Sequence, residues 1–241
     1  MDLDSNSLER LVPDRTMGGD VTGRETLELH LERYRFAAHL AGPGRLLDMA
    51  CGAGYGTRLL ADACPERAES IGVDLSEDAV AYARERYGRA GVEYRACNAM
   101  EFSDPESFDT IVSLETIEHL PDPTGFAKHL LTLLRPGGLL VASVPTTPSV
   151  DANPHHLHDF TEKSFRLLFE PAGLKEVARL PQVQPFEVGG ILRRSEARHS
   201  EIRPNLLQYY ATHPGAALRR VYATLRFGFT NRYLTVAWRA Q

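Results

Sequence analysis

The chain has few cysteines and no long hydrophobic run. Among its 241 residues, Cys51, Cys64 and Cys97 lie far apart, so we expect neither a disulfide framework nor a cysteine-based zinc site. Its apolar stretches reach strand length and fall short of the roughly 18 residues that a membrane span needs. The first ten residues, MDLDSNSLER, lack the apolar core of a signal peptide. These absences predict a cytoplasmic protein with no membrane partner.

Acidic residues are scarce near the C-terminus. From residue 186 to residue 241, nine arginines accompany three glutamates, so this quarter carries +6 and the remainder −11 within a formal net charge of −5. The overall negative charge and the lack of an aromatic and basic module argue against a nucleic acid as partner. The basic quarter either steers an anionic or sugar-linked small molecule or forms a solvated helix face.

Internal repeats and low-complexity segments are also absent, and the first 145 residues alternate between two patterns. Helical patterns separate short apolar runs at residues 45–49, 70–74, 92–96, 108–114 and 138–144. Strands joined by helices through short connections lie parallel, with right-handed crossovers and helices on both faces. We therefore predict a doubly wound α/β sheet.

Other segments flank this core. Apolar residues recur at helical spacing over 24–41, which predicts an N-terminal helix that ends at the following Gly-Pro-Gly. A connector rich in Pro, Thr and His follows Pro145, and we then expect a helix over 162–169 and strands over 174–180 and 233–239. The prediction is one domain over 1–241: a cofactor-binding core (25–180), a helical cap insertion (181–231) where acceptor choice would lie, and a closing strand (233–239).

Three glycines follow the first strand directly. Gly52, Gly54 and Gly56 lie where a ligand can approach the backbone at the carboxyl edge of the sheet. Asp74 ends the second strand 22 residues after Gly52, where a carboxylate can accept both ribose hydroxyls of an adenosine. A dinucleotide fingerprint would have a third glycine where Thr57 stands, which disfavours a nicotinamide oxidoreductase.

The run from Leu47 to Gly54 resembles the first motif of the class I S-adenosylmethionine-dependent methyltransferases. The resemblance covers roughly residues 25–180 and the last strand, and it implies a seven-stranded, mostly parallel sheet with an antiparallel last strand. It also implies S-adenosyl-L-methionine as cofactor, with these residues around it: Asp48, Ala50, Gly52, Gly54, Asp74, Leu75, Asn98, Ala99, Leu114 and Glu115.

Each part of the cofactor has expected partners. By the resemblance, Gly52 and Gly54 pack against the methionine part, Asp74 binds the ribose, and Asn98 with Ala99 meets the adenine. The family usually has Asp at the position of Asn98, but an amide oxygen can also accept from the adenine amino group. Asp48 would orient the cofactor's ammonium, cap the loop amides, or do both.

A Glu-x-x-Glu-His segment follows the fourth strand. Residues three apart on a helical turn share a face, so Glu115 and Glu118 are expected to converge beside His119. The connector can add an imidazole from His155, His156 or His158. Carboxylates with imidazoles suit Mg or another divalent metal. The pattern also resembles the metal-binding motif of ubiquinone-biosynthesis O-methyltransferases and of small-RNA 3′-end 2′-O-methyltransferases.

We predict a reaction centre of Glu115, Glu118, His119 and His158. These four are the metal ligands if an ion is bound, and otherwise His119 and His158 are the catalytic residues, acting as general bases. The reaction would be O-methylation of a small molecule such as a sugar or natural-product intermediate. N- or C-methylation at a metal-free site and a non-catalytic cofactor binder stay open, as does a homodimer. We interpret Arg33 as ordinary helix packing, with a carboxylate clamp as the alternative.

Overall fold

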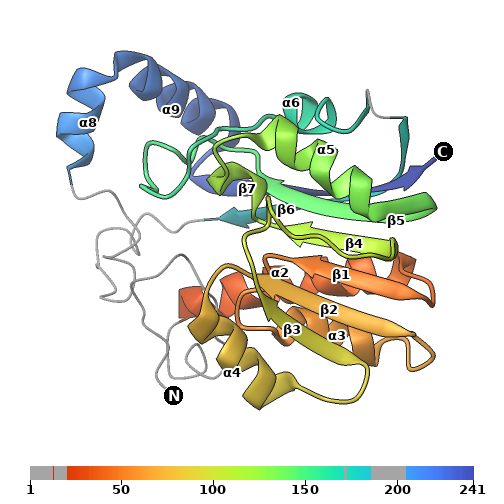
Figure 1. The fold of residues 1–241 in the computed structure, drawn as a ribbon. Coiled ribbons are helices and arrows are strands. Elements are labelled where there is room, and N and C mark those ends of the chain that lie inside the picture. The colour runs from red at the N-terminus through yellow and green to blue at the C-terminus, as the bar shows by residue number, and fades with distance from the viewer. Residues whose placement is uncertain (1–12, 14–20, 171–172, 186–204) are drawn as a thin grey trace.

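The computed structural model describes residues 13, 21–170, 173–185 and 205–241. Its centre is a seven-stranded sheet in the order β3-β2-β1-β4-β5-β7-β6 (Figure 1). Only β7 runs against its neighbours, β5 and β6, and the pairs among the other strands are parallel. The predicted doubly wound sheet with an antiparallel last strand is confirmed. The strands are β1 (Arg45–Met49), β2 (Glu69–Asp74), β3 (Val92–Ala96), β4 (Phe108–Leu114), β5 (Leu134–Pro145), β6 (Leu174–Pro185) and β7 (Thr230–Ala240).

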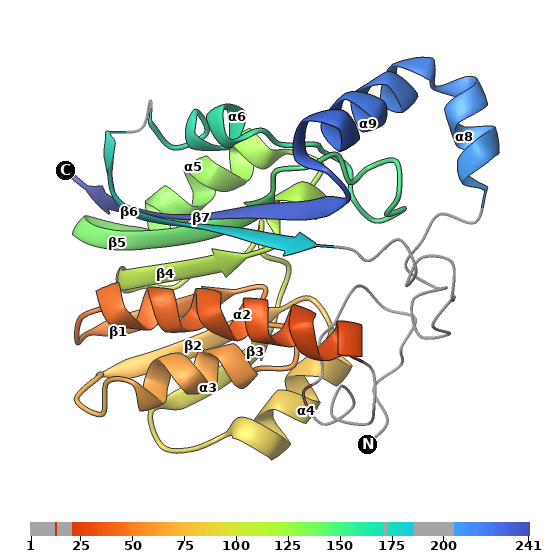
Figure 2. The same ribbon diagram turned by 180° about the vertical axis from the view of Figure 1, so that it is seen from behind.

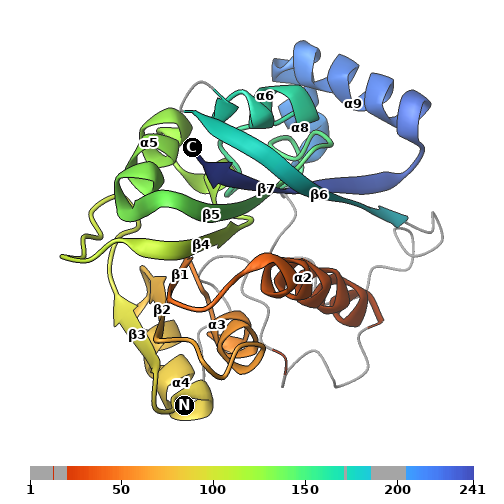
Figure 3. The same cartoon turned by 90° about the vertical axis from the view of Figure 1, so that its right-hand side faces the viewer.

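Helices lie on both faces of the sheet. Figure 2 shows α2 and α3 in front of one face, and α5 and α6 lie on the other, as the side view in Figure 3 confirms. The pair α8 and α9 projects beyond the end of the sheet where β1 and β4 finish (Figure 1). The helices are α2 (Val21–Leu40), α3 (Tyr55–Asp62), α4 (Glu77–Tyr87), η1 (Ile117–His119), α5 (Pro123–Leu133), α6 (Glu162–Arg166), α8 (Leu206–Thr212) and α9 (Pro214–Phe227).

Capping residues fix where the helices begin. The Ser76 hydroxyl accepts from the Ala79 amide, and two acidic residues follow it in the first turn of α4. The Asp122 side chain caps α5 in the same way, with a proline at the first helical position. Thr161 forms a capping box at α6. These caps hold the loops that precede them at the carboxyl ends of the parallel strands.

The sheet divides the core into two layers. The larger apolar cluster lies on the side of α5 and α6 and includes Phe126, Phe165 and Trp238. A smaller cluster on the other side packs Tyr34, Ala37 and Leu60 against the strands. Burial of side chains this large stabilises the sheet by roughly 1.5–3 kcal/mol each, so the strand ends that carry the site rest on a rigid base.

The last two strands of the chain are longer than predicted. β6 continues to Pro185 and β7 begins at Thr230, since the two pair as far as that rung. Residues at both ends of the predicted insertion over 181–231 therefore belong to the sheet. The described part of the insertion consists of α8, α9 and the residues beside them. Residues 186–204 lie outside the described residues. No helix within the described ranges is long and apolar enough to cross a membrane.

Candidate functional site

The glycine loop joins β1 to α3 across the end of β2. The Gly52 amide donates to Asp74 Oδ2 at 2.9 Å, and the Cys51 amide donates to the Val73 carbonyl at 2.9 Å. The Ser76 amide occupies the other oxygen of Asp74 at 3.0 Å. One carboxylate therefore fastens the loop after β1 to the start of α4.

The three glycines are needed for different reasons. A Cβ on Gly56 would lie 1.9 Å from the Tyr34 ring, and one on Gly54 would lie 2.4 Å from Ala83 Cβ. These two glycines therefore allow helices to pack closely. Gly52 has a φ of +55°, and a Cβ there would meet nothing within 4 Å. Gly52 is the position where the backbone faces open space that a ligand can enter.

Strain is concentrated beside this loop. Among the described residues, the non-glycine residues with positive φ are Ala50 (65°) and Glu115 (49°). They directly follow the adjacent strands β1 and β4. Left-handed backbone costs an L-residue roughly 1–2 kcal/mol, and such strain gathers at functional sites. Both residues mark the carboxyl edge of the sheet as the site.

Asp48 is buried beneath the loop. Its Oδ2 accepts from Thr57 Oγ1 at 2.7 Å, and its Oδ1 accepts from the Tyr34 hydroxyl at 3.4 Å. Burial raises the pKa of Asp48 to about 7, and these two hydrogen bonds oppose the rise only in part. The hydrogen bonds recorded for Asp48 thus come from hydroxyls rather than from the loop amides expected of a cap. A cation near Asp48 would favour its ionised form.

Two further predicted positions follow β2 and β3. Leu75, next to Asp74, is exposed despite being apolar. The Asn98 oxygen accepts from the Met100 amide at 3.0 Å, so this side chain caps the turn after β3. Ala99 lies in the same turn, and Leu114 is buried at the end of β4. An exposed leucine beside a fixed amide oxygen offers an apolar surface and an acceptor to a flat heterocycle.

Glu115 turns away from Glu118. The short helix η1 begins only at Ile117, and the left-handed backbone of Glu115 breaks the helical turn that the prediction assumed. Its carboxylate accepts from Ser143 Oγ at 2.7 Å and lies 3.4 Å from Arg33 Nη1. The structure therefore separates Glu115 from the other members of the predicted metal set.

Arg33 is buried, with 1% of it exposed. Its Nε donates to Gln182 Oε1 at 2.7 Å, and its guanidinium carbon lies 4.3 Å from the centre of the Tyr233 ring. Nη1 makes the ion pair with Glu115 but has no hydrogen-bond partner among the described residues. Burial of the guanidinium fits the packing interpretation, and an N–H of this kind can also donate to a ligand carboxylate, so both interpretations stay open.

Glu118, His119 and His156 form the metal-type cluster of the described chain. One ligand atom from each lies within 4.8 Å of the other two. Glu118 and His156 are buried, whereas His119 is only partly covered. The imidazoles of His119 and His156 meet edge to face, with ring centres 4.7 Å apart. A carboxylate and two imidazoles at this spacing can bind a divalent ion or move a proton.

Hydrogen bonds to the connector orient both imidazoles. His119 Nδ1 lies 3.2 Å from the His155 carbonyl, which can only accept, so Nδ1 carries the hydrogen and Nε2 is left as the basic nitrogen of the neutral ring. His156 Nδ1 lies 2.7 Å from Ser149 Oγ. Such outer contacts are typical of histidines that bind metals.

His158, predicted in the cluster, lies outside it. The connector's Leu157 and His158 amides donate to the Glu118 carbonyl, and His158 Nε2 lies 3.0 Å from the Leu120 carbonyl. This pairing anchors the connector against η1 and brings His156, rather than His158, beside Glu118 and His119. No periodic pattern in the sequence distinguishes these histidines, because the connector is a loop. The direction of each side chain depends on the hydrogen bonds that the loop backbone makes.

The cap is attached to the same connector. Asp151 is buried and accepts from Arg220 of α9 at 2.8 Å and from the Tyr210 hydroxyl of α8 at 2.6 Å. Arg220 also donates to the Pro148 carbonyl at 2.6 Å. Ser149, whose hydroxyl contacts His156 Nδ1, lies between Pro148 and Asp151. These contacts to the cap therefore fix the position of Ser149.

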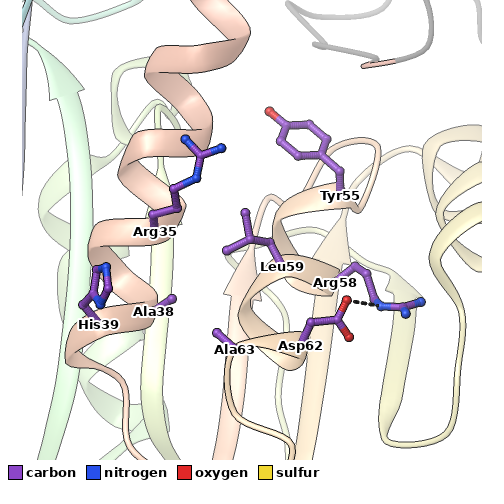
Figure 4. Close-up of a pocket in the computed structure, with 8 residues that line it drawn as sticks. All are labelled: Arg35, Ala38, His39, Tyr55, Arg58, Leu59, Asp62 and Ala63. Carbon is purple, nitrogen blue, oxygen red and sulfur yellow. Dashed lines mark hydrogen bonds and ion pairs between the residues drawn. The ribbon is translucent and has the colours of Figure 1, made fainter.

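Two hollows flank the site without forming it. One, of about 560 Å³, lies between α2 and α3, where Tyr55 and Leu59 stand opposite Arg35 and the Arg58–Asp62 ion pair closes one side (Figure 4). The other, of about 640 Å³, lies beside the connector, and its lining mixes apolar residues with polar ones, among them His158 and Asp159 of the connector and Arg219 of α9. Neither hollow is lined by Glu118, His119 or His156.

Known proteins resemble this chain in sequence and in fold. A family model described as a methyltransferase domain matches residues 47–142. A Mycobacterium tuberculosis protein named a probable S-adenosylmethionine-dependent methyltransferase is 35% identical over 196 residues, covering 74% of this chain and 68% of that protein. A ubiquinone biosynthesis O-methyltransferase of Xanthomonas euvesicatoria is 31% identical over 206 residues, covering 75% and 81%.

A solved structure shares the fold. The N-methyltransferase NodS from Bradyrhizobium japonicum, in complex with S-adenosyl-L-homocysteine, superposes with a TM-score of 0.62 over 96% of this chain and 94% of its own. Its sequence is 18% identical to this one. At that identity the likeness extends to the fold of the sheet and its helices.

Proposed function

Because the chain belongs to the S-adenosylmethionine-dependent methyltransferases, we propose that it methylates a hydroxyl oxygen of a small molecule at the cluster of Glu118, His119 and His156. That cluster is the observation that carries the proposal. Two of its members, Glu118 and His119, follow β4, which pairs with the strand that leads into the glycine loop, and His156 joins them from the connector after β5. A group that handles the acceptor belongs at this edge of the sheet, next to the cofactor.

The residues around the glycine loop fit the cofactor. Gly52 leaves open space for the methionine part, and Asp74 has two oxygens whose further lone pairs can accept from the ribose hydroxyls. Leu75 and Ala99 offer apolar surface to the adenine, and the Asn98 side chain is fixed beside them. The cofactor supplies an electrophilic methyl group on a sulfonium.

The charged ends of the methionine part have candidate partners. We assign its carboxylate to the buried Nη1 of Arg33, and its ammonium to the side of the loop that covers Asp48. Both side chains already hold their places through hydrogen bonds to Gln182 and Thr57. Because Arg33 Nη1 is buried, the chain beside it has to open before a ligand carboxylate can reach this atom.

Methyl transfer to oxygen requires that the acceptor hydroxyl lose its proton. His119 is the least buried member of the cluster, and its Nε2 is the basic nitrogen because Nδ1 carries the hydrogen. Glu118, buried next to it, stabilises the imidazolium that forms. In this metal-free form His119 is the general base.

The same three residues would hold a divalent ion. Two imidazoles and one carboxylate favour Mn, Fe or Zn over Mg, which prefers oxygen ligands. Such an ion lowers the pKa of a bound hydroxyl. His119 cannot be ligand and base at once, so the two forms of the site are distinguishable. The similarity to ubiquinone biosynthesis O-methyltransferases supports oxygen as the atom methylated.

Metal titration separates these forms. Calorimetry with Mn²⁺ should show binding by the wild type that falls at least about 10-fold in His156→Ala. His158→Ala is the matched control, because His158 lies on the same connector outside the cluster, and its Mn²⁺ affinity should be unchanged. No binding by the wild type would leave His119 as the general base. Equal losses in the two variants would contradict the assigned cluster.

A further inference from the structure

The helix α9 presents an apolar side to solvent. Its outward residues recur at intervals of three and four, which places them on one face of the helix: Leu218, Val221, Tyr222 and Leu225. All four are exposed, with Leu218 at 72% and Leu225 at 83%. The opposite side, with Ala216 and Ala223, packs inward. A surface helix usually turns its apolar residues towards the core, whereas α9 turns its large apolar residues towards solvent. These four residues are called the apolar stripe below.

Exposed aromatic and apolar residues extend the stripe. Phe229 follows α9 directly and is more than half exposed, and Leu207 on the adjoining α8 is more exposed still. Tyr222 lies within the stripe itself. Aromatic rings beside leucines are typical of surfaces that enter the boundary between lipid headgroups and acyl chains.

The charged side chains of α8 and α9 are all positive. Residues 202–241 contain no Asp or Glu, and the arginines of this pair of helices lie on α9. Arg226 stacks over the Phe227 ring at 5.2 Å, and Arg232 lies over the same ring at 4.9 Å. Arg220 instead points inward to Asp151. Arg219, next to Leu218, is exposed as well and lies 3.9 Å from Asp159 of the connector. The outward arginines of α9 therefore lie at both ends of the apolar stripe, Arg219 at one end and Arg226 at the other.

We propose that α9 lies flat on an anionic lipid surface, with the apolar stripe in the lipid and its arginines on the headgroups. Acidic headgroups supply the negative charge that α8 and α9 lack. A second copy of the chain fits less well, because a two-fold contact between apolar stripes would bring Arg226 towards arginines of the same sequence. The sequence predicts no membrane-spanning segment, and a helix lying on a surface needs none. The proposal is independent of methyl transfer.

Vesicle flotation tests this directly. The full chain is mixed with vesicles of phosphatidylcholine and phosphatidylglycerol in equal amounts, and in parallel with vesicles of phosphatidylcholine alone. We expect binding to the mixed vesicles at least about 10-fold tighter than to the neutral ones. Raising the salt from about 0.1 M to about 1 M shortens the screening length from about 10 Å to about 3 Å and should remove most of that preference.

Two double variants locate the contact. Leu218→Ser with Leu225→Ser should lower binding to the mixed vesicles at least about 10-fold without loss of stability, because both side chains are already exposed. Leu167→Ser with Val177→Ser changes two exposed apolar residues away from α9 and should bind as the wild type does. Arg226→Gln should reduce the preference for phosphatidylglycerol and leave the apolar stripe intact.

Three outcomes would overturn the proposal. The first is a wild type that floats with neither kind of vesicle. The second is equal binding by the wild type and the Leu218/Leu225 variant. The third is self-association of the wild type, abolished by that variant and accompanied by no vesicle binding, which would assign the apolar stripe to a second copy of the chain.

Discussion

The buried carboxyl of Asp48 makes protein stability depend on pH in a specific way. Folding raises the pKa of Asp48 from 3.8 to about 7, mainly because burial removes water from the charged form. Between these values the folded chain holds a proton that the unfolded chain has lost, so the free energy of unfolding falls as the pH rises. The fall is about 1.4 kcal/mol per pH unit and about 4 kcal/mol over the whole interval.

Asp48→Asn isolates this effect. Asparagine has nearly the same shape and can accept from Thr57 Oγ1, but it does not titrate. Urea unfolding of both proteins from pH about 4 to about 8 gives two stability curves, and their difference removes every other titrating group. We expect the wild type to lose about 4 kcal/mol relative to the variant across this range. Parallel curves would refute the account of Asp48.

The same carboxyl links stability to the cofactor. If the ammonium of S-adenosyl-L-homocysteine lies near Asp48, binding favours the ionised carboxylate and releases a proton near pH 7. Calorimetry in two buffers of different ionisation enthalpy should detect this proton with the wild type and not with Asp48→Asn. The absence of proton release from the wild type would show that the ammonium lies elsewhere.

Three further substitutions separate packing from binding. Gly56→Ala places a Cβ against the Tyr34 ring and should lower the free energy of unfolding in urea by about 1–3 kcal/mol. A variant that unfolds at the same urea concentration as the wild type would show that the ring can move aside. Gly52→Ala meets no atom of the described residues but places an L-residue at a φ of +55°, so it should cost about 1–2 kcal/mol of stability and also weaken S-adenosyl-L-homocysteine binding in calorimetry; unchanged affinity would remove Gly52 from the cofactor site. Arg220→Ala leaves Asp151 as a buried charge without its cation and should lower turnover more than cofactor affinity, while Arg220→Lys recovers part of it; equal turnover in wild type and Arg220→Ala would exclude a positioning role.

Sequence patterns predicted the sheet and the loop because local rules decide both. Alternating apolar runs mark the parallel strands, and Ser76 with its acidic neighbours fixes the start of α4 wherever the helix packs. The acid that fastens the glycine loop, Asp74, was found from its spacing to Gly52 alone. Each of these features depends on residues close together in the sequence, so it can be predicted without any tertiary contact.

The candidate reaction centre was predicted only in part, because two of its members depend on tertiary contacts. The assumption of a helical turn placed Glu115 with Glu118, but the chain enters a left-handed conformation at Glu115 and turns it towards Arg33. The choice of His156 over His158 depends on how the connector pairs with the Glu118 carbonyl. Arg33 occupied an ordinary helical position in the sequence, and only the packing of β6 and β7 over it shows that it is buried.

Methyl transfer by Glu118→Gln tests the central claim most directly. Turnover with a panel of phenols, catechols and sugars is measured with a labelled methyl donor, and S-adenosyl-L-homocysteine affinity is measured on the same preparations, with His158→Ala as the control. We predict that Glu118→Gln lowers turnover at least about 100-fold and changes that affinity less than about twofold, whereas His158→Ala keeps most of the activity. Wild-type turnover by Glu118→Gln would contradict the assignment of the reaction centre to Glu118, His119 and His156.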